Sequence, residues 1–283
     1  YMEGKKYGED DGEYIKMEVD TESGEISIET DPLGRLPLYL YQKKDNFALF
    51  REVKALYPFF ELTIDPVGMY EYLLFGYPLW RSTLFKEVKR VFPDFRINLN
   101  FRTGEFRWSD KNPIFETKGN GCSIEELSEL LLASTARRCG EQNYLFLSGG
   151  MDSRLVGAAL SREGVNFTPI FFVLRDGTYS EEREIARQLS RLLKKDLIEF
   201  EIQSNGNYIK TLARMKDGLN SAGAFMLHLF ELLHPQKGVF FTGDGGDKVL
   251  PDLRPPRKLA SVSGLIQYIL EENALINPSR LKS

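Results

Sequence analysis

A strand pattern that passes through a serine and two glycines directly into a helical pattern constrains this chain more than any other feature. Residues 144–147 are Tyr-Leu-Phe-Leu, residues 148–150 are Ser-Gly-Gly, and a helical pattern follows over Ser153–Glu163. Adjacent glycines let the backbone approach an oligophosphate, and hydroxyls and helix N-terminal N–H groups favour its oxygens. The spacing differs from the Walker A and Gly-x-Gly-x-x-Gly loops. It predicts a phosphate-binding turn, with an ordinary tight strand–helix turn as the alternative.

Strand and helix patterns alternate through the second half of the chain. We expect helices over 123–138, 153–163 and 180–193 and two helical segments over 208–233, with strands over 144–147, 168–174, 197–202 and 239–242. Ser123 with Glu126 three residues later predicts a capping box, and Ser180 is expected to cap its helix. Strands separated by helices of this length favour right-handed βαβ units. The sequence therefore predicts an α/β domain with a parallel sheet.

The first half of the chain has a different pattern, which predicts a smaller α+β domain with antiparallel pairing. Strand hairpins are expected around the turns at 43–46 and 102–104, and alternation at Ile26 and Ile28 indicates another strand. Asp65-Pro66 predicts the start of a helix that continues to Phe75. Residues 111–121 have the composition of a linker, so we divide the chain into domains 1–117 and 118–283.

Composition excludes several classes of protein. Lys and Arg number 37 against 41 Asp and Glu, a net charge of −4, so no overall positive field attracts nucleic acid or anionic lipid. No apolar run approaches the roughly 20 residues needed to span a bilayer. The two cysteines, Cys122 and Cys139, form no Cys-x-x-Cys motif and cannot supply a disulfide framework. We therefore expect no nucleic-acid or membrane partner, and the reducing cytoplasm as the location.

Two loops resemble those of a known enzyme family. Ser148-Gly149-Gly150-Met151-Asp152-Ser153 resembles the Ser-Gly-Gly-x-Asp-Ser signature of the ATP pyrophosphatases, or PP-loop enzymes, and in particular their asparagine synthetase and β-lactam synthetase branch. Thr242–Lys248, which also follows an apolar strand, resembles that branch's Ser-Gly-Glu-Gly-x-Asp-Glu loop. The resemblance implies an adenine nucleotide alpha hydrolase-like fold. Loops at the carboxyl ends of parallel strands are expected to face one crevice.

The resemblance implies that ATP and Mg²⁺ are the cofactors. A substrate carboxylate would attack the α-phosphorus, pyrophosphate would leave, and ammonia or an amine would displace AMP to give an amide. The positions that match the family's motifs are Asp152 and Asp247 for the metal, Leu147, Val173 and Gly243 for the adenosine, Ser148, Gly149, Gly150 and Ser153 for the phosphates, and Asp244 near the reacting acyl group. For the two metal-binding aspartates, plain N-cap or turn-forming roles are the alternative.

The N-terminal domain resembles the second half of the branch's Ntn-type glutaminase domain. The matching segments are 31–39, 53–56, 72–77 and 83–85. Neither cysteine lies where the family has its nucleophile, so we expect no glutaminase activity and a nitrogen donor that is free ammonia or an amine.

Three positions depart from the family pattern. Lys248 stands where the family has an acidic residue. Residues 217–225 lack the Thr- and Arg-bearing segment with which asparagine synthetases hold aspartate. No residue matches the family's catalytic lysine, and we assign that role to neither Lys258 nor Lys282. Aspartate is therefore not the expected substrate.

Two function classes follow. The first is an ATP-dependent amide-forming ligase that acts on a small carboxylate. The alternative is a non-catalytic ATP- or AMP-binding sensor or assembly protein, or a fragment of a larger asparagine synthetase; a homodimer is left open. The remaining candidates are interpreted as structural: His228 as a helix-core residue, Glu181, Glu182 and Glu184 as residues that favour the start of a helix, and Trp80 and Trp108 as core aromatics.

Overall fold

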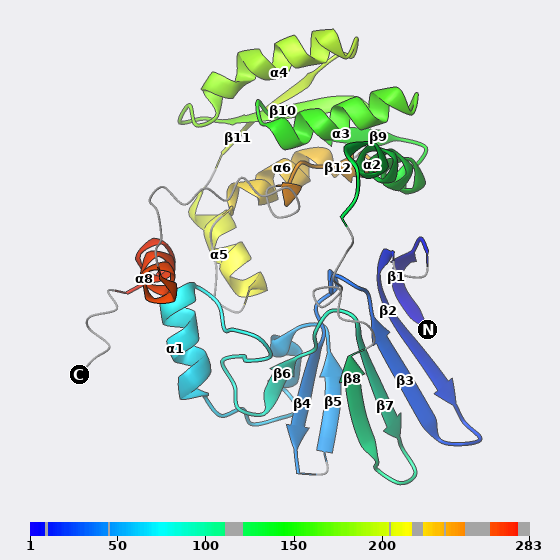
Figure 1. Cartoon of the computed structure of the whole chain (residues 1–283). Helices are drawn as coiled ribbons and strands as arrows, with labels where there is room; N and C mark the ends of the chain where they lie inside the picture. The colour runs from blue at the N-terminus through cyan, green and yellow to red at the C-terminus, as the bar shows by residue number, and fades with distance from the viewer. Residues whose placement is uncertain are drawn as a thin grey trace. The chain divides into compact units, whose positions relative to one another are not determined.

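The structure, a computed structural model, describes residues 1–8, 11–44, 46–110, 121–203, 205–216, 223–234, 236–246 and 261–276. The chain forms two compact units, Tyr1–Gly119 with Leu259–Ser283, and Asn120–Lys258 (Figure 1). The division expected from the sequence lies two residues before the first of these boundaries, but it assigns 259–283 to the other unit. Helix α8 (Val262–Asn273) packs on α1 (Pro66–Phe75), and the Leu275 N–H donates to the Leu73 carbonyl at 2.9 Å.

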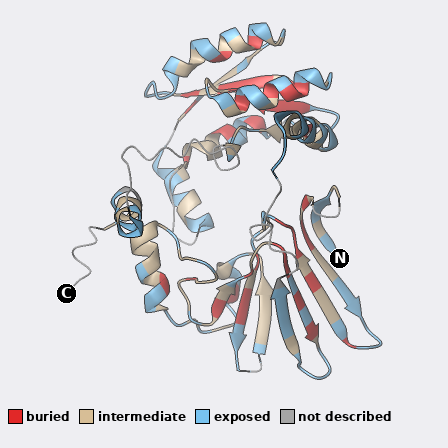
Figure 2. Ribbon diagram, in the orientation of Figure 1, coloured by how far each residue is buried: buried red, intermediate tan, exposed pale blue. Residues whose placement is uncertain are grey.

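The first unit contains two antiparallel sheets. The larger has the order β1-β2-β3-β7-β8 and the smaller the order β5-β4-β6. Their strands are β1 (Met2–Lys6), β2 (Gly12–Asp20), β3 (Glu25–Thr30), β4 (Tyr39–Lys43), β5 (Asn46–Phe50), β6 (Val88–Arg90), β7 (Phe95–Asn100) and β8 (Phe106–Asp110), and a 3₁₀ helix, η1, covers Val53–Leu56. Alternate residues of β7 are buried, and Phe95 and Ile97 pack in the core with Ile28 and Leu40. Figure 2 shows buried residues on the strands of this unit.

Local chemistry explains the boundaries in this unit. The Asp65 carboxylate accepts the Val67 N–H at 3.1 Å, Pro66 is the first helical residue and the helix continues to Phe75, as the sequence predicts. Gly76 then ends α1 at φ +78°. The predicted hairpins are confirmed as β4–β5 and β7–β8. The strands β1, β2 and β6 were not predicted. In β1 the side chains are largely exposed and the strand is held by main-chain pairing with β2, so no apolar alternation marks it.

The second unit contains the predicted parallel sheet, with strand order β11-β10-β9-β12. Its elements are α2 (Ile124–Arg138), β9 (Asn143–Phe146), α3 (Met151–Arg162), β10 (Thr168–Leu174), α4 (Ser180–Leu192), β11 (Ile198–Ile202), α5 (Gly206–Met215), α6 (Phe225–Leu233) and β12 (Val239–Phe241). On one face Leu145 and Leu147 pack with Leu160 of α3; on the other, Tyr144 and Ile170 pack with Leu229 and Leu233 of α6.

The helix starts in this unit differ in how well they were predicted. The capping box of Ser123 and Glu126 is confirmed, with both reciprocal hydrogen bonds present. The capping role expected for Ser180 is wrong: Ser180 is the first helical residue, and the preceding Tyr179 is the N-cap at φ +69° without a side-chain cap. Helix α3 begins at Met151, two residues earlier than expected, directly after Gly150.

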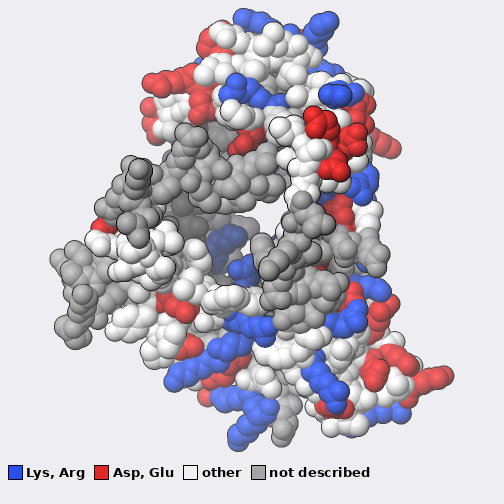
Figure 3. All heavy atoms as spheres, viewed as in Figure 1, with Lys and Arg blue, Asp and Glu red and all other residues white. Residues whose placement is uncertain are grey.

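Surface charge and the apolar content of the helices bear on whether a segment could cross a bilayer. In the view of Figure 3 both acidic and basic side chains lie on the surface of each unit. None of the helices in the described ranges combines the length and apolar composition that a bilayer crossing requires.

Candidate functional site

The first loop, between β9 and α3, is shaped by two serines. The Ser148 N–H donates to Ser153 Oγ at 3.1 Å, the two hydroxyl oxygens lie 3.1 Å apart, and the Gly150 N–H donates to Ser148 Oγ at 3.1 Å. Ser153 is 3% exposed. These bonds fold residues 148–150 tightly back on the first turn of α3, whose N-cap, Gly150, supplies no side-chain acceptor.

The second loop, which follows β12, touches the first. A Cβ atom on Gly243 would lie 2.6 Å from the Ser153 nitrogen, and one on Gly246 would lie 2.5 Å from Asp152 Cγ. Real Cβ atoms do not approach that closely. Glycine is required at position 243, where the contact is with backbone, whereas a side chain at position 246 would displace the Asp152 carboxylate. The loops meet because β12 pairs in parallel with β9 and both strands end at one edge of the sheet. Asp247 follows Gly246 and lies outside the described residues, as do Lys248, Lys258 and Lys282.

A cavity of about 620 Å³ opens where the loops meet. It brings together seven predicted site residues: Leu147, Ser148, Gly150, Asp152, Ser153, Gly243 and Asp244. The Asp244 N–H donates to Thr242 Oγ1 at 3.2 Å, which ties this residue to the end of β12. The sequence-based expectation that two acidic loops face one crevice therefore matches the geometry.

Two predicted residues lie beside the cavity rather than in its wall. The Val173 side chain is 6% exposed and packs with Phe171 and Ala186, beneath α4. The Cβ position of Gly149 faces Ile185 at 3.3 Å, and its N–H donates to a Glu182 carboxylate oxygen at 3.2 Å. A ligand in the cavity therefore meets no Val173 side chain, and the Gly149 amide already has an acceptor.

Glu182 is a site residue that the sequence analysis missed. It was interpreted as one of three acidic residues that favour a helix N-terminus, but its carboxylate lines the cavity and accepts from Gly149. With Asp152 and Asp244 it gives the cavity three carboxylates, and no Lys or Arg lies among the described lining residues. Within the described ranges, no three His, Cys, Asp or Glu side chains are grouped closely enough to hold a metal ion.

Aromatic rings form the remaining wall and were also missed. Phe146 and Phe240, on adjacent strands, stack with centroids 6.0 Å apart, and Phe172 of β10 meets Tyr179 at 5.7 Å and Phe225 at 6.0 Å. The three strand residues occur near the carboxyl ends of β9, β10 and β12. That shared position is the only sequence signal that could have found them.

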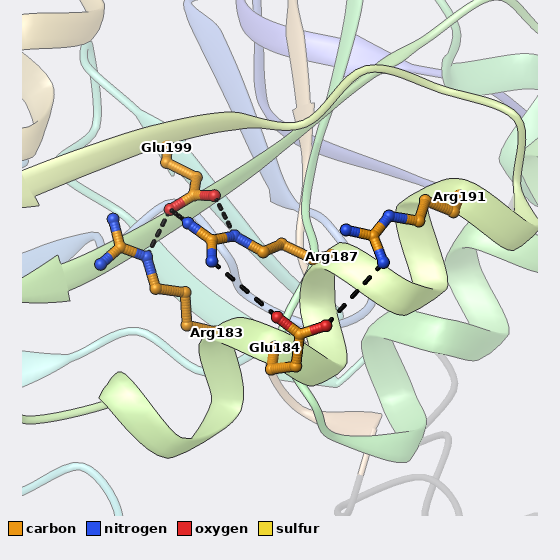
Figure 4. A network of polar contacts seen from close by, with 5 residues as sticks. All are labelled: Arg183, Glu184, Arg187, Arg191 and Glu199. Carbon is orange, nitrogen blue, oxygen red and sulfur yellow. Dashed lines mark hydrogen bonds and ion pairs between the residues drawn. The ribbon is translucent and has the colours of Figure 1, made fainter.

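Helix α4, which carries Glu182, is anchored by a network of ion pairs (Figure 4). The Glu199 carboxylate of β11 accepts a hydrogen bond of 2.6 Å from Arg187 Nε and forms an ion pair with Arg183. The Glu184 carboxylate lies 3.8 Å from the Arg187 guanidinium and 3.9 Å from that of Arg191. The hydrogen bond from Arg187 is the main cause that lowers the pKa of Glu199, and the same bond raises the pKa of Arg187. The network joins α4 to the edge strand β11, and Glu182 of the same helix contacts the first loop.

A second groove, of about 710 Å³, lies between α5 and α6 and shares only Phe230 with the loop cavity. Tyr208 donates a hydrogen bond of 2.6 Å to Glu231, which raises the pKa of the Tyr208 hydroxyl, and its ring stacks on His228 at 5.7 Å. His228 Nδ1 accepts the Gln203 N–H at 3.1 Å. His228 thus joins α6 to the end of β11, in agreement with its structural interpretation.

One family model matches part of the chain, and several solved structures resemble it at low identity. Residues 126–261 match the family model described as asparagine synthase. Among solved structures, an NMN synthetase from Francisella tularensis has 16% identity and a TM-score of 0.33, covering 58% of this chain and 75% of that one. A glutamine-dependent NAD⁺ synthetase from Acinetobacter baumannii, solved in complex with ADP, has 16% identity and a TM-score of 0.34. The match covers 73% of this chain and 42% of that one. No curated protein matches.

Proposed function

We propose that the second unit binds Mg-ATP and transfers its adenylyl group to a small carboxylate, as the match of residues 126–261 to the asparagine synthase family model suggests. The observation that carries the proposal is the contact between the two loops, in which Gly243 and Gly246 lie directly against Ser153 and Asp152. Backbone loops this close, at the carboxyl edge of a parallel sheet, form a narrow cradle suited to an oligophosphate.

The charge of the cavity fits a nucleotide that brings its own cation. Three carboxylates and no described basic residue line the cavity, so a bare triphosphate would meet repulsion. Mg²⁺ takes oxygen ligands from one or two carboxylates together with phosphates and water, and Asp152 and Asp247 are the residues we assign to it. When bound, the ion neutralises charge on the departing pyrophosphate.

The adenosine would lie against the apolar residues of the cavity wall. Leu147 and Gly243 lie in that wall, and the rings of Phe146, Phe172 and Phe240 supply the flat apolar surface that a purine requires. A contact from Val173 would have to come from its main chain, since its side chain packs beneath α4.

The proposed reaction has two steps. A carboxylate oxygen of the substrate attacks the α-phosphorus of ATP while the bond to the bridging oxygen of pyrophosphate breaks, which gives an acyl-adenylate. Ammonia or an amine then attacks the acyl carbon and AMP leaves with the electron pair. Asp244, held by Thr242 at the cavity wall, is the residue we assign to the acyl group.

Calorimetric titration of ATP with and without Mg²⁺ tests this proposal. We expect Mg-dependent binding that Asp152→Asn and Asp247→Asn each weaken at least tenfold. Asp196→Asn, at an exposed position outside the cavity, is the matched control and should bind normally. Absence of Mg-dependent binding to the unaltered chain would contradict the proposal. If Mg-ATP binds but none of a panel of carboxylates supports exchange of pyrophosphate into ATP, the result would favour the sensor alternative.

A further inference from the structure

Three aromatic rings in the wall of the loop cavity contact one another. The ring centroids of Phe172, Tyr179 and Phe225 lie 5.7, 6.0 and 6.4 Å apart, and the Glu182 carboxylate lines the same cavity. We term the three rings the aromatic corner, and we propose that the corner and Glu182 bind a methylated ammonium group carried by the carboxylate substrate. The inference rests on the proposed function and adds the class of substrate to it.

The rings of the aromatic corner are inclined to one another. Phe172 and Tyr179 meet at 87°, Tyr179 and Phe225 at 59°, and Phe172 and Phe225 at 43°. In the same cavity, Phe146 and Phe240 are closer to parallel, at 25°. A purine can lie across two nearly parallel rings, but it cannot lie flat on two perpendicular ones. The corner therefore fits a compact, rounded group better than a second flat one.

Glu182 supplies negative charge close to the corner. Its N–H donates to the Tyr179 carbonyl at 3.2 Å, so the two residues lie one turn apart at the start of α4. No Lys or Arg occurs among the described residues of the cavity wall, so none of them neutralises Glu182 from there. The faces of aromatic rings and a carboxylate both attract a cation. The group that this part of the cavity favours is therefore positively charged.

The number of hydrogen-bond acceptors decides which kind of ammonium fits. A primary ammonium brings three N–H donors. Within the set, the acceptors are the Tyr179 hydroxyl and the Glu182 carboxylate, whose Oε2 already accepts the Gly149 N–H at 3.2 Å. A trimethylammonium group has no N–H, keeps its charge and presents methyl groups to the rings, and aromatic rings recognise such cations. The corner therefore favours a methylated ammonium over a primary one.

The ring of Tyr179 is positioned by a strained turn rather than by burial. Its φ is +69°, in the left-handed region, and the residue is 40% exposed. The turn before it is closed by two hydrogen bonds, from the Leu174 N–H to the Thr178 carbonyl at 3.1 Å and from the Gly177 N–H to the Leu174 carbonyl at 2.9 Å. Strained residues of this kind cluster at ligand-binding sites. The position of Tyr179 thus agrees with a role in binding.

Choline and 3,3-dimethylbutan-1-ol separate charge from shape, because the alcohol has carbon in place of the quaternary nitrogen. Each is titrated into the protein without ATP or Mg²⁺, and the methyl signal of the ligand is followed by NMR. We expect saturable binding of choline, about tenfold tighter than that of the alcohol and of ethanolamine, which carries a primary ammonium. No saturable binding of choline, or binding of either comparison compound as tight as that of choline, would overturn the proposal.

Variants locate the binding at the corner. Glu182→Gln keeps an oxygen that can accept the Gly149 N–H but removes the charge, and it should weaken choline binding about fivefold. Tyr179→Leu removes one aromatic face and should weaken it by a similar factor, with an unchanged midpoint of urea denaturation as the check on folding. Glu181→Gln, at the exposed neighbouring position, is the matched control and should bind choline normally. Unchanged affinity of Glu182→Gln would contradict the proposal.

Pyrophosphate exchange tests the link to the substrate. In the presence of Mg-ATP, 4-(trimethylammonio)butanoate should support exchange, and 5,5-dimethylhexanoate, its uncharged counterpart in shape, should not. If Mg-ATP binds but choline does not, the class of substrate is wrong and the proposed function stands. If choline binds but Mg-ATP does not, the proposed function fails, and the assignment of the cation to a substrate fails with it.

Discussion

Replacing Gly246 by alanine tests the loop contact directly. The new Cβ would lie 2.5 Å from Asp152 Cγ and 2.8 Å from its Oδ1, whereas an ordinary contact begins near 3.4 Å, so the carboxylate must move by about 3.4 − 2.5 = 0.9 Å. Overpacking of this kind costs roughly 1–3 kcal/mol, and we expect the low end because the Asp152 side chain can rotate away. The effect on binding is larger, since a displacement of about 1 Å in a positioned group can cost on the order of 100-fold.

The assay for Gly246→Ala is titration of Mg-ATP together with urea denaturation. Gly206→Ala is the matched control, because a Cβ at that exposed first residue of α5 meets nothing within 4 Å. We expect Gly206→Ala to bind normally and to gain up to about 1 kcal/mol of stability. The reasoning would be refuted if Gly246→Ala bound Mg-ATP as tightly as the unaltered chain.

Three further predictions concern carboxylates. Because Arg187 lowers the pKa of Glu199, this pair stabilises the fold above the ordinary carboxyl pKa, and the stabilisation is lost as the pH falls through the lowered value. Glu199→Gln should therefore lower the free energy of unfolding by about 1 kcal/mol at neutral pH. Urea denaturation should show this difference between the variant and the unaltered chain vanishing in acid. Glu182→Gln removes one of three cavity charges, so titration of ATP in a metal chelator should show affinity about fivefold higher. Asp31→Ala should destabilise the first unit by about 2 kcal/mol in denaturation, because the fully buried Asp31 carboxylate accepts the N–H groups of Leu33 and Arg35.

The sequence predicted the parallel sheet and the meeting of the two loops because both follow from local rules. Apolar strands such as 168–174 alternate with helical patterns, and parallel strands must end at a common edge, so motifs after two adjacent strands converge. Five motif residues could therefore be placed in one crevice before the structure was known: Leu147, Ser148, Gly150, Asp152 and Ser153. Asp247 remains a prediction, since it lies outside the described residues.

The missed features depend on contacts that local patterns do not encode. An acidic residue in the first turn of a helix has a sufficient local explanation, so nothing in the sequence distinguished Glu182 from Glu181, although only Glu182 reaches the Gly149 amide. The adenosine contact predicted for Val173 stays a prediction, and the motif position did not indicate that the pleat of β10 turns its side chain toward α4. Trp80 was interpreted as a core residue, and no composition rule predicts its left-handed φ.

The position of Glu182 links the ion-pair network to the loop. Glu182 precedes Arg183, whose partner Glu199 sits on β11, and its own carboxylate receives the N–H of Gly149. A rigid first turn of α4 therefore determines how far the Glu182 carboxylate stands from the loop. If the network is loosened by Glu199→Gln, Glu182 should leave Gly149 more often, and exchange of the Gly149 amide hydrogen should quicken more than that of Leu145 in the sheet core. Equal acceleration at both amides would mean that the network stabilises the whole unit rather than positioning Glu182.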